Sequence, residues 1–303
     1  MKSVVVENIV KRYGTKKAPI IALHGISFEV EKGELFGIIG PDGAGKTSLF
    51  RILTTLLLAE EGKATVDGSD VVKDYKTIRN SVGYMPGRFS LYQDLTVKEN
   101  LDFFATIFNT SIEENYELIK DVYSQIEPFK DRKAGKLSGG MKQKLALSCA
   151  LIHRPSVLFL DEPTTGVDAV SRKEFWEMLK KLKHQHITIL VSTPYMDEAG
   201  LCDRVALIQS GRILSIDTPQ GVINSFGKKL FAVKSNNMLQ LLNDLKQCKD
   251  VEDAYPFGEY HHVVMKNGGE TELNNCLRQT GKEYHLKSVE PDIEDCFIAL
   301  MKN

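Results

Sequence analysis

The chain has 303 residues, of which 42% are hydrophobic, so it can form a sizeable core, and its length predicts two domains or one large domain with an appendage. Its formal net charge is −1, which gives no basic field of the kind that attracts nucleic acid, and we expect no nucleic-acid partner.

The sequence has no clear transmembrane helix, signal peptide or metal-binding cysteine pattern. The mean hydropathy is −0.20, and no apolar run approaches the ~20 residues of a transmembrane helix. The first residues have no long apolar stretch that would indicate a signal peptide. The five cysteines lack metal-like spacing, and we expect reduced, buried thiols in a cytosolic protein. They are Cys149, Cys202, Cys248, Cys276 and Cys296.

The chain opens with a small β region. Residues 4–10 and 26–30 have strand composition, and residues 14–19 have the composition of a loop between them. Tyr13 lies near this loop. An aromatic side chain there can stack on a nucleotide base, although a lone tyrosine is more often a packing residue.

A glycine-rich segment then follows an apolar run. Residues 35–39 (LFGII) predict a buried strand, and residues 49–58 predict a helix. The pattern between them, GPDGAGKTS, is typical of a phosphate-binding loop, in which backbone N–H groups surround an anion at a helix start. We expect Lys46 to contact phosphate oxygens and the Thr47 hydroxyl to bind Mg²⁺. The candidate nucleotide-binding residues here are Gly40, Pro41, Asp42, Gly43, Ala44, Gly45, Lys46, Thr47 and Ser48.

The next segment contains a connection that is unusually apolar. Residues 63–66 and 82–85 predict strands, and residues 86–92 (PGRFSLY) form the connection. This loop either packs on its own domain or docks another protein, since exposed aromatic loops usually have partners. Residues 96–108 then have helical spacing, and helical sequence continues to about residue 129.

A second helix start with anion-binding character lies at LSGGM. Ser138 is a good N-cap, and Gly139 and Gly140 allow a close approach of the backbone. A helix is expected to follow, over residues 143–152. Alone, this pattern is a common capped turn. The signature residues are Leu137, Ser138, Gly139, Gly140 and Met141.

Two acidic residues follow the apolar run at residues 156–160. Carboxylates at the carboxyl end of a buried parallel strand lie where ligands bind in doubly wound sheets, so Asp161 is predicted to hold Mg²⁺ and Glu162 to hold a water. Residues 166–168 predict a tight turn that ends at Asp168. A helix over residues 171–183, a buried strand over 188–192 and a hairpin over 205–216 complete this region.

Residues beyond about 225 change in character, and we predict domains at 1–225 and 226–303. The second contains, in order, a strand (230–234), a helix (238–247), two strands (251–256 and 260–265), a helix (271–279), a strand (284–289) and a final helix (293–301). This order suggests a small ferredoxin-like α+β domain. His261 and His262 are adjacent in a strand and should point to opposite faces, so we expect no shared metal.

Together these motifs resemble the nucleotide-binding subunit of an ABC transporter, over about residues 2–220. The motifs are GPDGAGKT, LSGGM, VLFLDEPTTGVD and VSTPYMDEA, and the C-terminal SVEPDIEDCFIALM resembles the end of drug- and antibiotic-exporting members (the ABC-2 type). The resemblance implies an α/β P-loop NTPase fold, with a mixed sheet core, an antiparallel β subdomain and a helical subdomain.

The resemblance also implies the ligands and the assembly. ATP and Mg²⁺ would be the cofactors, Tyr13 would stack on adenine, Thr47 and Asp161 would hold Mg²⁺, and Lys46 and Glu162 would be the catalytic residues. The LSGGM helix start and Asp168 would act across the interface of a dimer, which would be a homodimer or a heterodimer with a second ABC ATPase.

Two positions depart from the family pattern. Gly87 stands where the family has a Gln that contacts Mg²⁺ and the attacking water. Pro194 stands where the family has a His that senses the γ-phosphate, and it offers neither a side-chain donor nor a backbone N–H. Arg88 and Gln93 are the nearby candidates to replace the Gln.

The predicted function is therefore an ATP-hydrolysing subunit that drives a separate membrane permease, which is an exporter of drugs or hydrophobic compounds. The protein would be cytoplasmic and peripheral on the inner face of the cell membrane, held there by the permease. Two alternatives stay open: a hydrolysis-poor regulatory ATP-binding subunit, and a soluble ABC ATPase without a role in transport.

Overall fold

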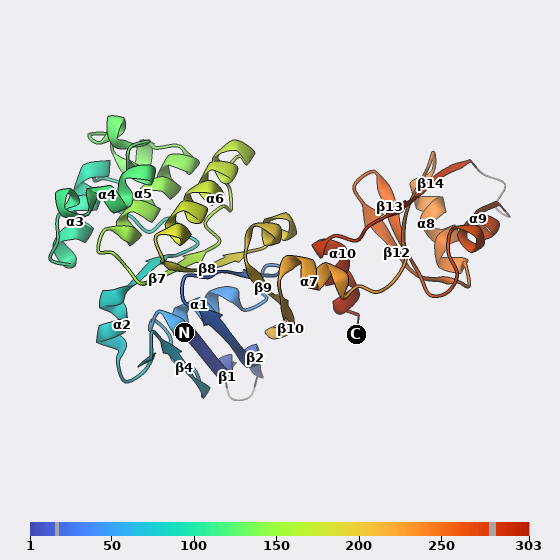
Figure 1. The fold of residues 1–303 in the computed structure, drawn as a ribbon, viewed down its shortest axis with the longest axis horizontal. Coiled ribbons are helices and arrows are strands. Elements are labelled where there is room, and N and C mark those ends of the chain that lie inside the picture. Colours follow the sequence, from blue (N-terminus) through green and yellow to red (C-terminus); the bar gives the residue numbers. More distant parts are fainter. Residues whose placement is uncertain (16–17, 279–282, 303) are drawn as a thin grey trace. The chain divides into compact units, whose positions relative to one another are not determined.

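The computed structural model describes residues 1–15, 18–278 and 283–302, and the chain forms two compact units, Met1–Gln220 and Gly221–Asn303 (Figure 1). The boundary predicted from the sequence, at residue 225, lies just after helix α7 (Pro219–Asn224). Each unit is described by itself below.

Unit 1 contains two sheets. The central sheet has the strand order β10-β9-β3-β8-β7-β6, and all its neighbouring strands are parallel except the antiparallel pair β9 and β10. Its strands are β3 (Leu35–Ile39), β6 (Val82–Met85), β7 (Val157–Asp161), β8 (Thr188–Thr193), β9 (Arg204–Gln209) and β10 (Arg212–Asp217). The second sheet is antiparallel, with the order β2-β1-β4-β5. Its strands are β1 (Lys2–Thr15), β2 (Ala18–Glu31), β4 (Glu61–Val66) and β5 (Ser69–Asp70).

The helices of unit 1 include a group, α3 to α5, that lies together on one side of the central sheet (Figure 1). The α-helices are α1 (Lys46–Leu53), α2 (Tyr75–Ser81), α3 (Val97–Ile107), α4 (Ile112–Tyr123), α5 (Gly139–Leu151) and α6 (Ala169–His184). The 3₁₀ helices are η1 (Glu127–Phe129), η2 (Ala134–Lys136) and η3 (Met196–Leu201). A mixed sheet, an antiparallel sheet and a helical group confirm the predicted fold class.

Two sequence predictions in this region are wrong. The segment at residues 14–19 is not simply a loop, because β1 runs to Thr15 and β2 starts at Ala18, while residues 16–17 lie outside the described part. The helix predicted over residues 49–58 ends at Leu53. Thr55 has a φ of 63°, and this left-handed residue turns the chain toward β4.

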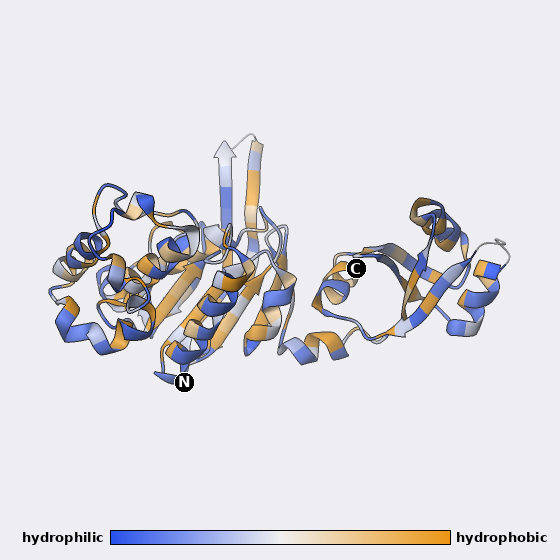
Figure 2. Cartoon of the chain, turned by 90° about the horizontal axis from the view of Figure 1, so that it is seen from above, coloured by the Kyte–Doolittle hydropathy of each residue, from blue (hydrophilic) through white to orange (hydrophobic). Residues whose placement is uncertain are grey.

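Helix α1 lies between the two sheets of unit 1. It contacts β7 of the central sheet as well as β2 and β4 of the antiparallel sheet. Its Phe50 is fully buried and packs edge-to-face on Phe159 of β7, with ring centroids 5.8 Å apart. Figure 2 shows that the strands of the central sheet are largely hydrophobic. One continuous core thus fixes the position of α1, whose first residue is Lys46.

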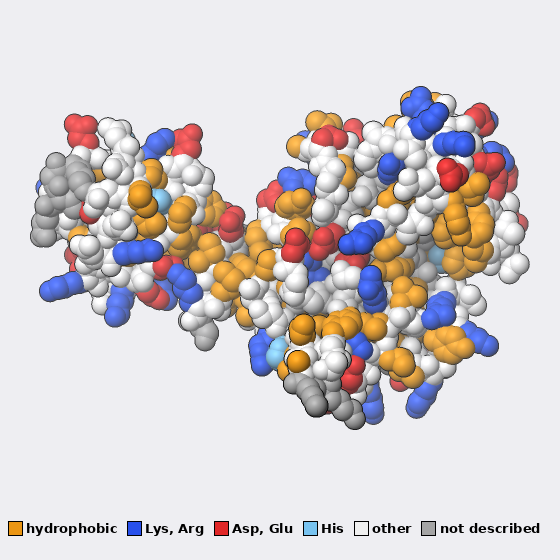
Figure 3. Space-filling model, turned by 180° about the vertical axis from the view of Figure 1, so that it is seen from behind, with side chains coloured by type: hydrophobic (Ala, Val, Ile, Leu, Met, Phe, Trp, Pro, Cys, Tyr) orange, Lys and Arg blue, Asp and Glu red, His pale blue; other side chains and the backbone are white. Residues whose placement is uncertain are grey.

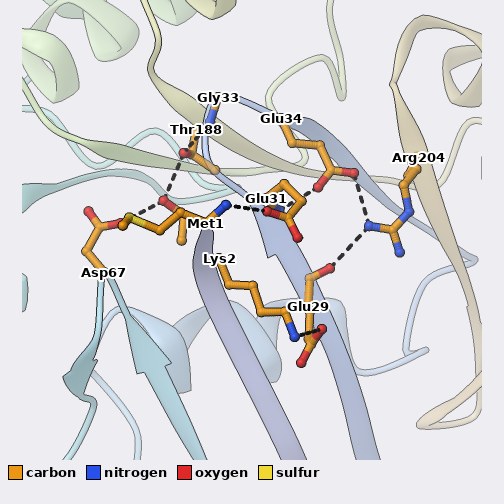
Figure 4. Close-up of polar contacts among 10 residues, drawn as sticks. Met1, Lys2, Glu29, Glu31, Gly33, Glu34, Asp67, Thr188 and Arg204 are labelled. Atoms are coloured by element: carbon orange, nitrogen blue, oxygen red, sulfur yellow. Dashed lines mark hydrogen bonds and ion pairs between the residues drawn. The ribbon is translucent and has the colours of Figure 1, made fainter.

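A polar network also joins the two sheets (Figure 4). The Thr188 hydroxyl of β8 accepts a hydrogen bond from the Gly33 N–H at 2.9 Å and donates to the Ser3 hydroxyl of β1 at 3.0 Å. The Ser3 hydroxyl donates to Asp67 at 2.6 Å, and the Ser156 hydroxyl donates to the other carboxylate oxygen of Asp67 at 2.5 Å. These bonds fix the antiparallel sheet against the starts of β7 and β8.

Unit 2 is built around one antiparallel sheet with the order β12-β13-β11-β14. In chain order its elements are β11 (Leu230–Ser235), α8 (Met238–Gln247), β12 (Val251–Phe257), β13 (Tyr260–Met265), α9 (Glu270–Arg278), β14 (Tyr284–Val289) and α10 (Ile293–Leu300). The predicted βαββαβ order is confirmed, and the strand order is that of a ferredoxin-like domain. Residue 279, which the sequence places at the end of the second helix, lies outside the described residues.

The expectation that all five cysteines are reduced thiols is wrong for two of them in unit 2. Cys248 and Cys276 form a disulfide, with Cα atoms 6.0 Å apart, because the end of α8 and the middle of α9 pack on the same face of the sheet. They are 28 residues apart in sequence, so no local spacing indicates the pair. The other three, Cys149, Cys202 and Cys296, are buried free thiols, as expected.

The two adjacent histidines of β13 point to opposite faces, as predicted. His261 Nε2 lies 2.7 Å from the Met238 carbonyl oxygen of α8. On the other face, His262 Nδ1 lies 2.7 Å from the carboxylate of Asp295, which is fully buried and also accepts from the Tyr255 hydroxyl at 2.8 Å. This carboxylate therefore attaches α10 to the sheet.

The Asp295 carboxylate has a second role at the start of α10. It forms a capping box with Asp292, in which each side chain accepts from the other residue's backbone N–H. Burial opposes its ionisation, but the hydrogen bonds from His262, the Asp292 amide and Tyr255 outweigh burial and hold the pKa of Asp295 below its usual value. The charged form is therefore the one that stabilises unit 2.

No helix among the described residues is long and apolar enough to cross a membrane.

We predict that Asp295→Ala lowers the melting temperature of unit 2 by roughly 8 °C or more. The change removes the acceptor shared by the buried His262 and the partly buried Tyr255, together with the capping box, and these losses cost about 2 kcal/mol or more. Differential scanning calorimetry measures this shift. The only tryptophan, Trp176, is buried in unit 1, so the transition of its fluorescence serves as the control and should not move. Identical calorimetric traces for the variant and the parent chain would contradict the assignment.

The pH dependence of the same contribution has a definite sign. Because the pKa of Asp295 is lowered by folding, its stabilisation is present above the unfolded value of ~3.9 and is lost as the pH falls further toward the folded value. The difference in melting temperature between parent and Asp295→Ala should accordingly shrink below about pH 4.

Candidate functional site

The glycine-rich loop, residues 40–48, connects β3 to α1 and lines a small pocket of about 260 Å³. The pocket is lined by Tyr13, Ala22, Gly43, Ala44, Gly45, Lys46, Thr47, Ser48 and Glu162. Gly45 is the N-cap of α1 and has a φ of 104°, which other residues rarely adopt. A Cβ atom at Gly40 would lie 2.0 Å from the Ile208 carbonyl oxygen, so only glycine fits there. The loop can therefore present its N–H groups to an anion at the start of α1.

Lys46 is the buried cation of the pocket. Its side chain is 3% exposed, and its ammonium donates to the carbonyl oxygens of Gly40 at 2.8 Å and Pro41 at 3.0 Å. It also lies 3.0 Å from a carboxylate oxygen of Glu162. The structure thus brings together the phosphate-loop lysine and the acidic residue after β7, as the sequence predicts.

Asp161 is buried at the end of β7, next to the start of α1. It accepts a hydrogen bond from the Ser192 hydroxyl of β8 at 2.7 Å. Burial raises the pKa of Asp161 above its usual value, while hydrogen bonds from Ser192 and Thr47 act against this shift. A buried carboxylate with a raised pKa is a group that a cation would stabilise in its charged form.

The backbone of Glu162 adopts a conformation that is rare outside glycine. Its φ is 51°, and its N–H donates to the carbonyl oxygen of Ser192 at 3.0 Å and to the hydroxyl of Ser192 at 3.1 Å. Such conformations cost about 1–3 kcal/mol and persist where the surrounding structure enforces them, often at functional sites. Ser192 thus directs the Glu162 side chain toward Lys46.

The residues present fit Mg²⁺. The Thr47 hydroxyl and the Asp161 carboxylate supply two oxygen ligands beside the phosphate loop, and Mg²⁺ in nucleotide sites is held by one or two protein oxygens together with substrate phosphates. Over the described parts of the chain, no group of three or more His, Cys, Asp or Glu side chains could form an all-protein metal site.

Tyr13 lies at the edge of the pocket, near the end of β1. Its side chain is exposed, and its hydroxyl lies 3.0 Å from the Ser48 hydroxyl. The Lys11 ammonium lies 5.4 Å from the ring centroid. The ring is therefore placed beside the loop, where a base could stack on it.

The LSGGM segment does not line this pocket. Ser138 caps α5 by accepting from the Met141 N–H at 3.3 Å. Gly140 packs so closely on α6 that a Cβ atom would lie 2.6 Å from the Ser171 hydroxyl. Asp168 caps α6, and hydrogen bonds from Ser171 hold the pKa of Asp168 below its usual value. Residues 137–141 and Asp168 therefore form a second cluster, apart from the loop and near the start of α6.

Of the two departures from the pattern of the resembled family, Gly87 lies beside the acidic residues and Pro194 follows the neighbouring strand β8. A Cβ atom at Gly87 would lie 3.0 Å from the Asp161 carbonyl oxygen. Pro194 directly follows β8, whose last residue is Thr193. Gln93, a proposed replacement for the missing Gln, does not reach this place, because its carbonyl oxygen accepts from the Gly135 N–H and its side chain lies near Gly135.

The aromatic connection after β6 is only partly exposed. Leu91 is buried, with 8% of its surface exposed, so at this residue the connection packs on its own domain, which is one of the two possibilities that the sequence left open. Tyr92 is 51% exposed and packs edge-to-face on Phe103, with centroids 4.9 Å apart. The exposed apolar surface near the connection is therefore formed by Tyr92 and Phe103, whereas Leu91 is buried.

A groove of about 440 Å³ lies next to this connection. Its lining residues are Arg51, Thr54, Leu56, Arg79, Val82, Tyr84, Met85, Pro86, Ser90, Leu91, Phe104, Phe108, Ala146, Cys149, Ala150 and His153. Figure 3 shows hydrophobic side chains gathered on this side of unit 1. Burial raises the pKa of Tyr84 to about 12, so its hydroxyl stays protonated in the wall of the groove.

Two buried polar residues next to the site were not singled out from the sequence. Ser192 holds Asp161 and Glu162, as described above. Glu198 is buried behind β8 and accepts hydrogen bonds from the hydroxyls of Thr164 at 2.8 Å and Thr193 at 2.5 Å. Both residues lie within the quoted segment VSTPYMDEA. Asp161, Glu162 and Thr164 are 30 to 34 residues away in sequence, so only the segment itself could have drawn attention to Ser192 and Glu198.

Comparisons with known proteins agree with this geometry. A family model described as ABC transporter matches residues 23–165. The probable multidrug ABC transporter ATP-binding protein YbhF of Escherichia coli is 35% identical over 303 residues, covering 98% of this chain and 52% of YbhF. This chain thus spans about half the length of that relative. The daunorubicin resistance ATP-binding protein DrrA2 of Streptomyces coeruleorubidus is 36% identical over 305 residues, covering 97% of this chain and 93% of DrrA2.

Solved structures resemble the chain as well. A dimeric post-hydrolysis state of the ATP-binding cassette MJ0796, bound to ADP and Pi, matches with a TM-score of 0.65 and 26% identity, over 71% of this chain and 98% of that one. CbiO1 from Clostridium perfringens, part of the ABC transporter complex cbiONQ, also matches with a TM-score of 0.65 and 26% identity, over 74% of this chain and 92% of that one.

Proposed function

Because this chain belongs to the family of ABC transporter ATP-binding proteins, we propose that it binds and hydrolyses ATP to drive a separate membrane permease. The permease exports drugs or other hydrophobic compounds, a proposal supported by the names of the multidrug and daunorubicin relatives. The protein lies on the cytoplasmic face of the membrane, where the permease holds it.

One observation carries this proposal: unit 1 has two separate helix starts that suit an anion. The start of α1 lies in the pocket with Lys46 and Glu162, whereas the start of α5 lies near α6 and lines no part of that pocket. A phosphate group in the pocket is therefore left for another chain's α5 to cover. Each of two ATP molecules would be bound between the loop of one subunit and residues 137–141 of the other.

Each side chain of the pocket has a separate role in ATP binding and hydrolysis. Lys46 binds the β- and γ-phosphates, and Tyr13 stacks on the adenine. Glu162 orients the attacking water and accepts its proton, because its carboxylate lies near the lysine that marks the phosphate position. Thr47 and Asp161 hold Mg²⁺, which neutralises charge that develops on the phosphates when it is bound.

The partner surface for the permease is the groove beside the aromatic connection. Its lining is largely apolar, and Tyr92 and Phe103 lie exposed nearby. Such surfaces are typical of sites where a partner helix docks. The groove also contains Tyr84 and Met85 of β6, which lie next to β7 and its Asp161.

A second candidate function is a hydrolysis-poor ATP-binding subunit. It is favoured by Gly87 and Pro194, which place no polar side chain where the family has its two γ-phosphate contacts. In this case the subunit pairs with a sister ATPase that keeps both side chains. A third possibility is a soluble ABC ATPase without a permease. The apolar groove argues against it, because such a surface suits a docked partner helix.

We predict that Lys46→Ala weakens the binding of Mg–ATP at least tenfold. The substitution removes a charge-assisted contact worth on the order of 1.5–3 kcal/mol. Isothermal titration calorimetry measures the affinity. Lys144→Ala is the matched control, because it also breaks a Lys–Glu contact, of 2.7 Å to Glu174, but outside the pocket. Equal affinity in the Lys46→Ala and Lys144→Ala variants would exclude the pocket as the nucleotide site.

For the groove, we predict that the double variant Tyr92→Ser and Phe103→Ser keeps its melting temperature within a few degrees but no longer co-purifies with the co-expressed permease. Both side chains are exposed, so their loss costs little folding free energy. Leu91→Ser is the contrasting variant and should lower the melting temperature, since Leu91 is buried. Retained co-purification of the double variant would place the permease elsewhere.

The departures at Gly87 and Pro194 predict an asymmetric pair. Losing one positioned transition-state donor costs ~10²–10³ in rate, so this chain's own pocket should turn over slowly, while its α5 completes the sister's pocket. In the complex with the sister subunit, Glu162→Gln should slow ATP turnover only modestly. Ser138→Arg should nearly stop turnover, because it blocks the sister's phosphate. A homodimer that hydrolyses ATP at several per second would disprove this asymmetry.

A further inference from the structure

One buried carboxylate, that of Glu198, joins two loops that leave the central sheet. Its side chain lies in η3, after β8, and is 2% exposed. One carboxylate oxygen accepts from the Thr193 hydroxyl at 2.5 Å, and the other accepts from the Thr164 hydroxyl at 2.8 Å. Both threonines are buried. Thr193 ends β8, and Thr164 lies in the turn that connects β7 to α6.

On the side of the pocket, the end of β8 contacts both the phosphate loop and the acidic residues. The carbonyl oxygen of Thr193 accepts from the N–H of Gly40, the first residue of the loop, at 3.2 Å. The neighbouring Ser192 holds Asp161 and the backbone of Glu162. A shift of the loop on phosphate binding therefore acts directly on Thr193.

On the other side, Thr164 begins the turn that leads to the N-cap of α6. Its carbonyl oxygen accepts from the Val167 N–H at 3.3 Å, and Asp168 follows as the cap. The Arg172 side chain of α6 returns to the same carboxylate, with Nε 3.8 Å from Glu198. Glu198 thus contacts both the turn, through Thr164, and the first turn of α6, through Arg172.

Because Glu198 is buried, breaking any of these hydrogen bonds is costly. A carboxylate taken out of water costs several kcal/mol unless its oxygens are hydrogen-bonded or paired with a cation, and here two hydroxyls and one guanidinium do this. A buried acceptor that loses one donor is destabilised, so the two loops keep their contact with Glu198 when either moves. Apolar packing alone would allow them to slide independently.

Pro194 makes this connection more important in this chain. It follows Thr193 and has no side-chain donor to contact a phosphate, so the loop after β8 meets the phosphate loop through the backbone of Thr193. We propose that Glu198 is a positioning residue that couples phosphate occupancy of the pocket to the turn at Asp168, the cap of α6 that faces the second subunit. This inference rests on the proposed nucleotide binding.

The test uses Thr164→Val, which keeps the shape of the side chain and removes one donor to Glu198. Hydrogen–deuterium exchange of the amides from Gly166 to Arg172 is measured on the full chain with and without Mg–AMP-PNP, a non-hydrolysable ATP analogue. In the parent, the analogue should slow exchange in this segment at least fivefold. In Thr164→Val this slowing should be lost, while the affinity for the analogue stays within about twofold.

Two further variants separate positioning from stability. Thr164→Ser keeps the hydroxyl and should restore the nucleotide-dependent slowing. Asp197→Asn, which alters only an exposed partner of Arg172, should leave it unchanged. A purely structural role would raise exchange equally with and without the analogue, and that result would overturn the inference.

The outcomes also separate this inference from the proposed function. Normal affinity of the parent for the analogue, without any slowing of exchange at Gly166–Arg172, overturns the coupling alone. Absence of measurable affinity in the parent overturns both. The same loss of slowing in Thr164→Val and Thr164→Ser would show that the hydroxyl is irrelevant and would also overturn the inference.

Discussion

Unit 1 depends on the burial of one positive charge, the ammonium of Lys46. A charge this deep costs several kcal/mol unless it is surrounded by acceptors, and the acceptors come from three directions: the carbonyl oxygens of Gly40 and Pro41 and the carboxylate of Glu162. The phosphate loop must therefore curl around its own lysine, and β7 must end beside it. The core around Phe50, which holds α1 between two sheets, makes this arrangement rigid.

Much of unit 1 could be predicted because its signals are local. The start of α3 at Thr96 is encoded by a capping box with Glu99, three residues away, and β6 was predicted with its observed bounds. The errors arise where partners are distant. The arms of the β1–β2 hairpin extend because Tyr13 pairs with Ile20 across it, and α1 stops at Leu53 because tertiary structure turns the chain at Thr55.

In the candidate site and in unit 2, too, local patterns could be predicted and contacts between distant residues could not. The phosphate loop and the two carboxylates are contiguous motifs, and the alternation of strands and helices after residue 225 was sufficient to predict a ferredoxin-like order. No local pattern, however, indicates that His262 meets Asp295, 33 residues later, or that Cys248 meets Cys276. Glu198 likewise accepts a hydrogen bond from Thr164, which lies 34 residues earlier in the sequence. Hydrogen bonds of buried polar groups decide these contacts, and such bonds depend on the completed fold.

The tight space at Gly87 has a consequence for any redesign of the site. A Cβ atom there would lie 3.0 Å from the carbonyl oxygen of Asp161, a backbone atom at the end of a fully buried strand. Backbone in such a strand yields far less readily than a side chain. A larger side chain at Gly87 is therefore accommodated only if the loop after β6, rather than β7, yields by a few tenths of an ångström. A redesign that introduces a side chain there must consequently begin with the path of this loop.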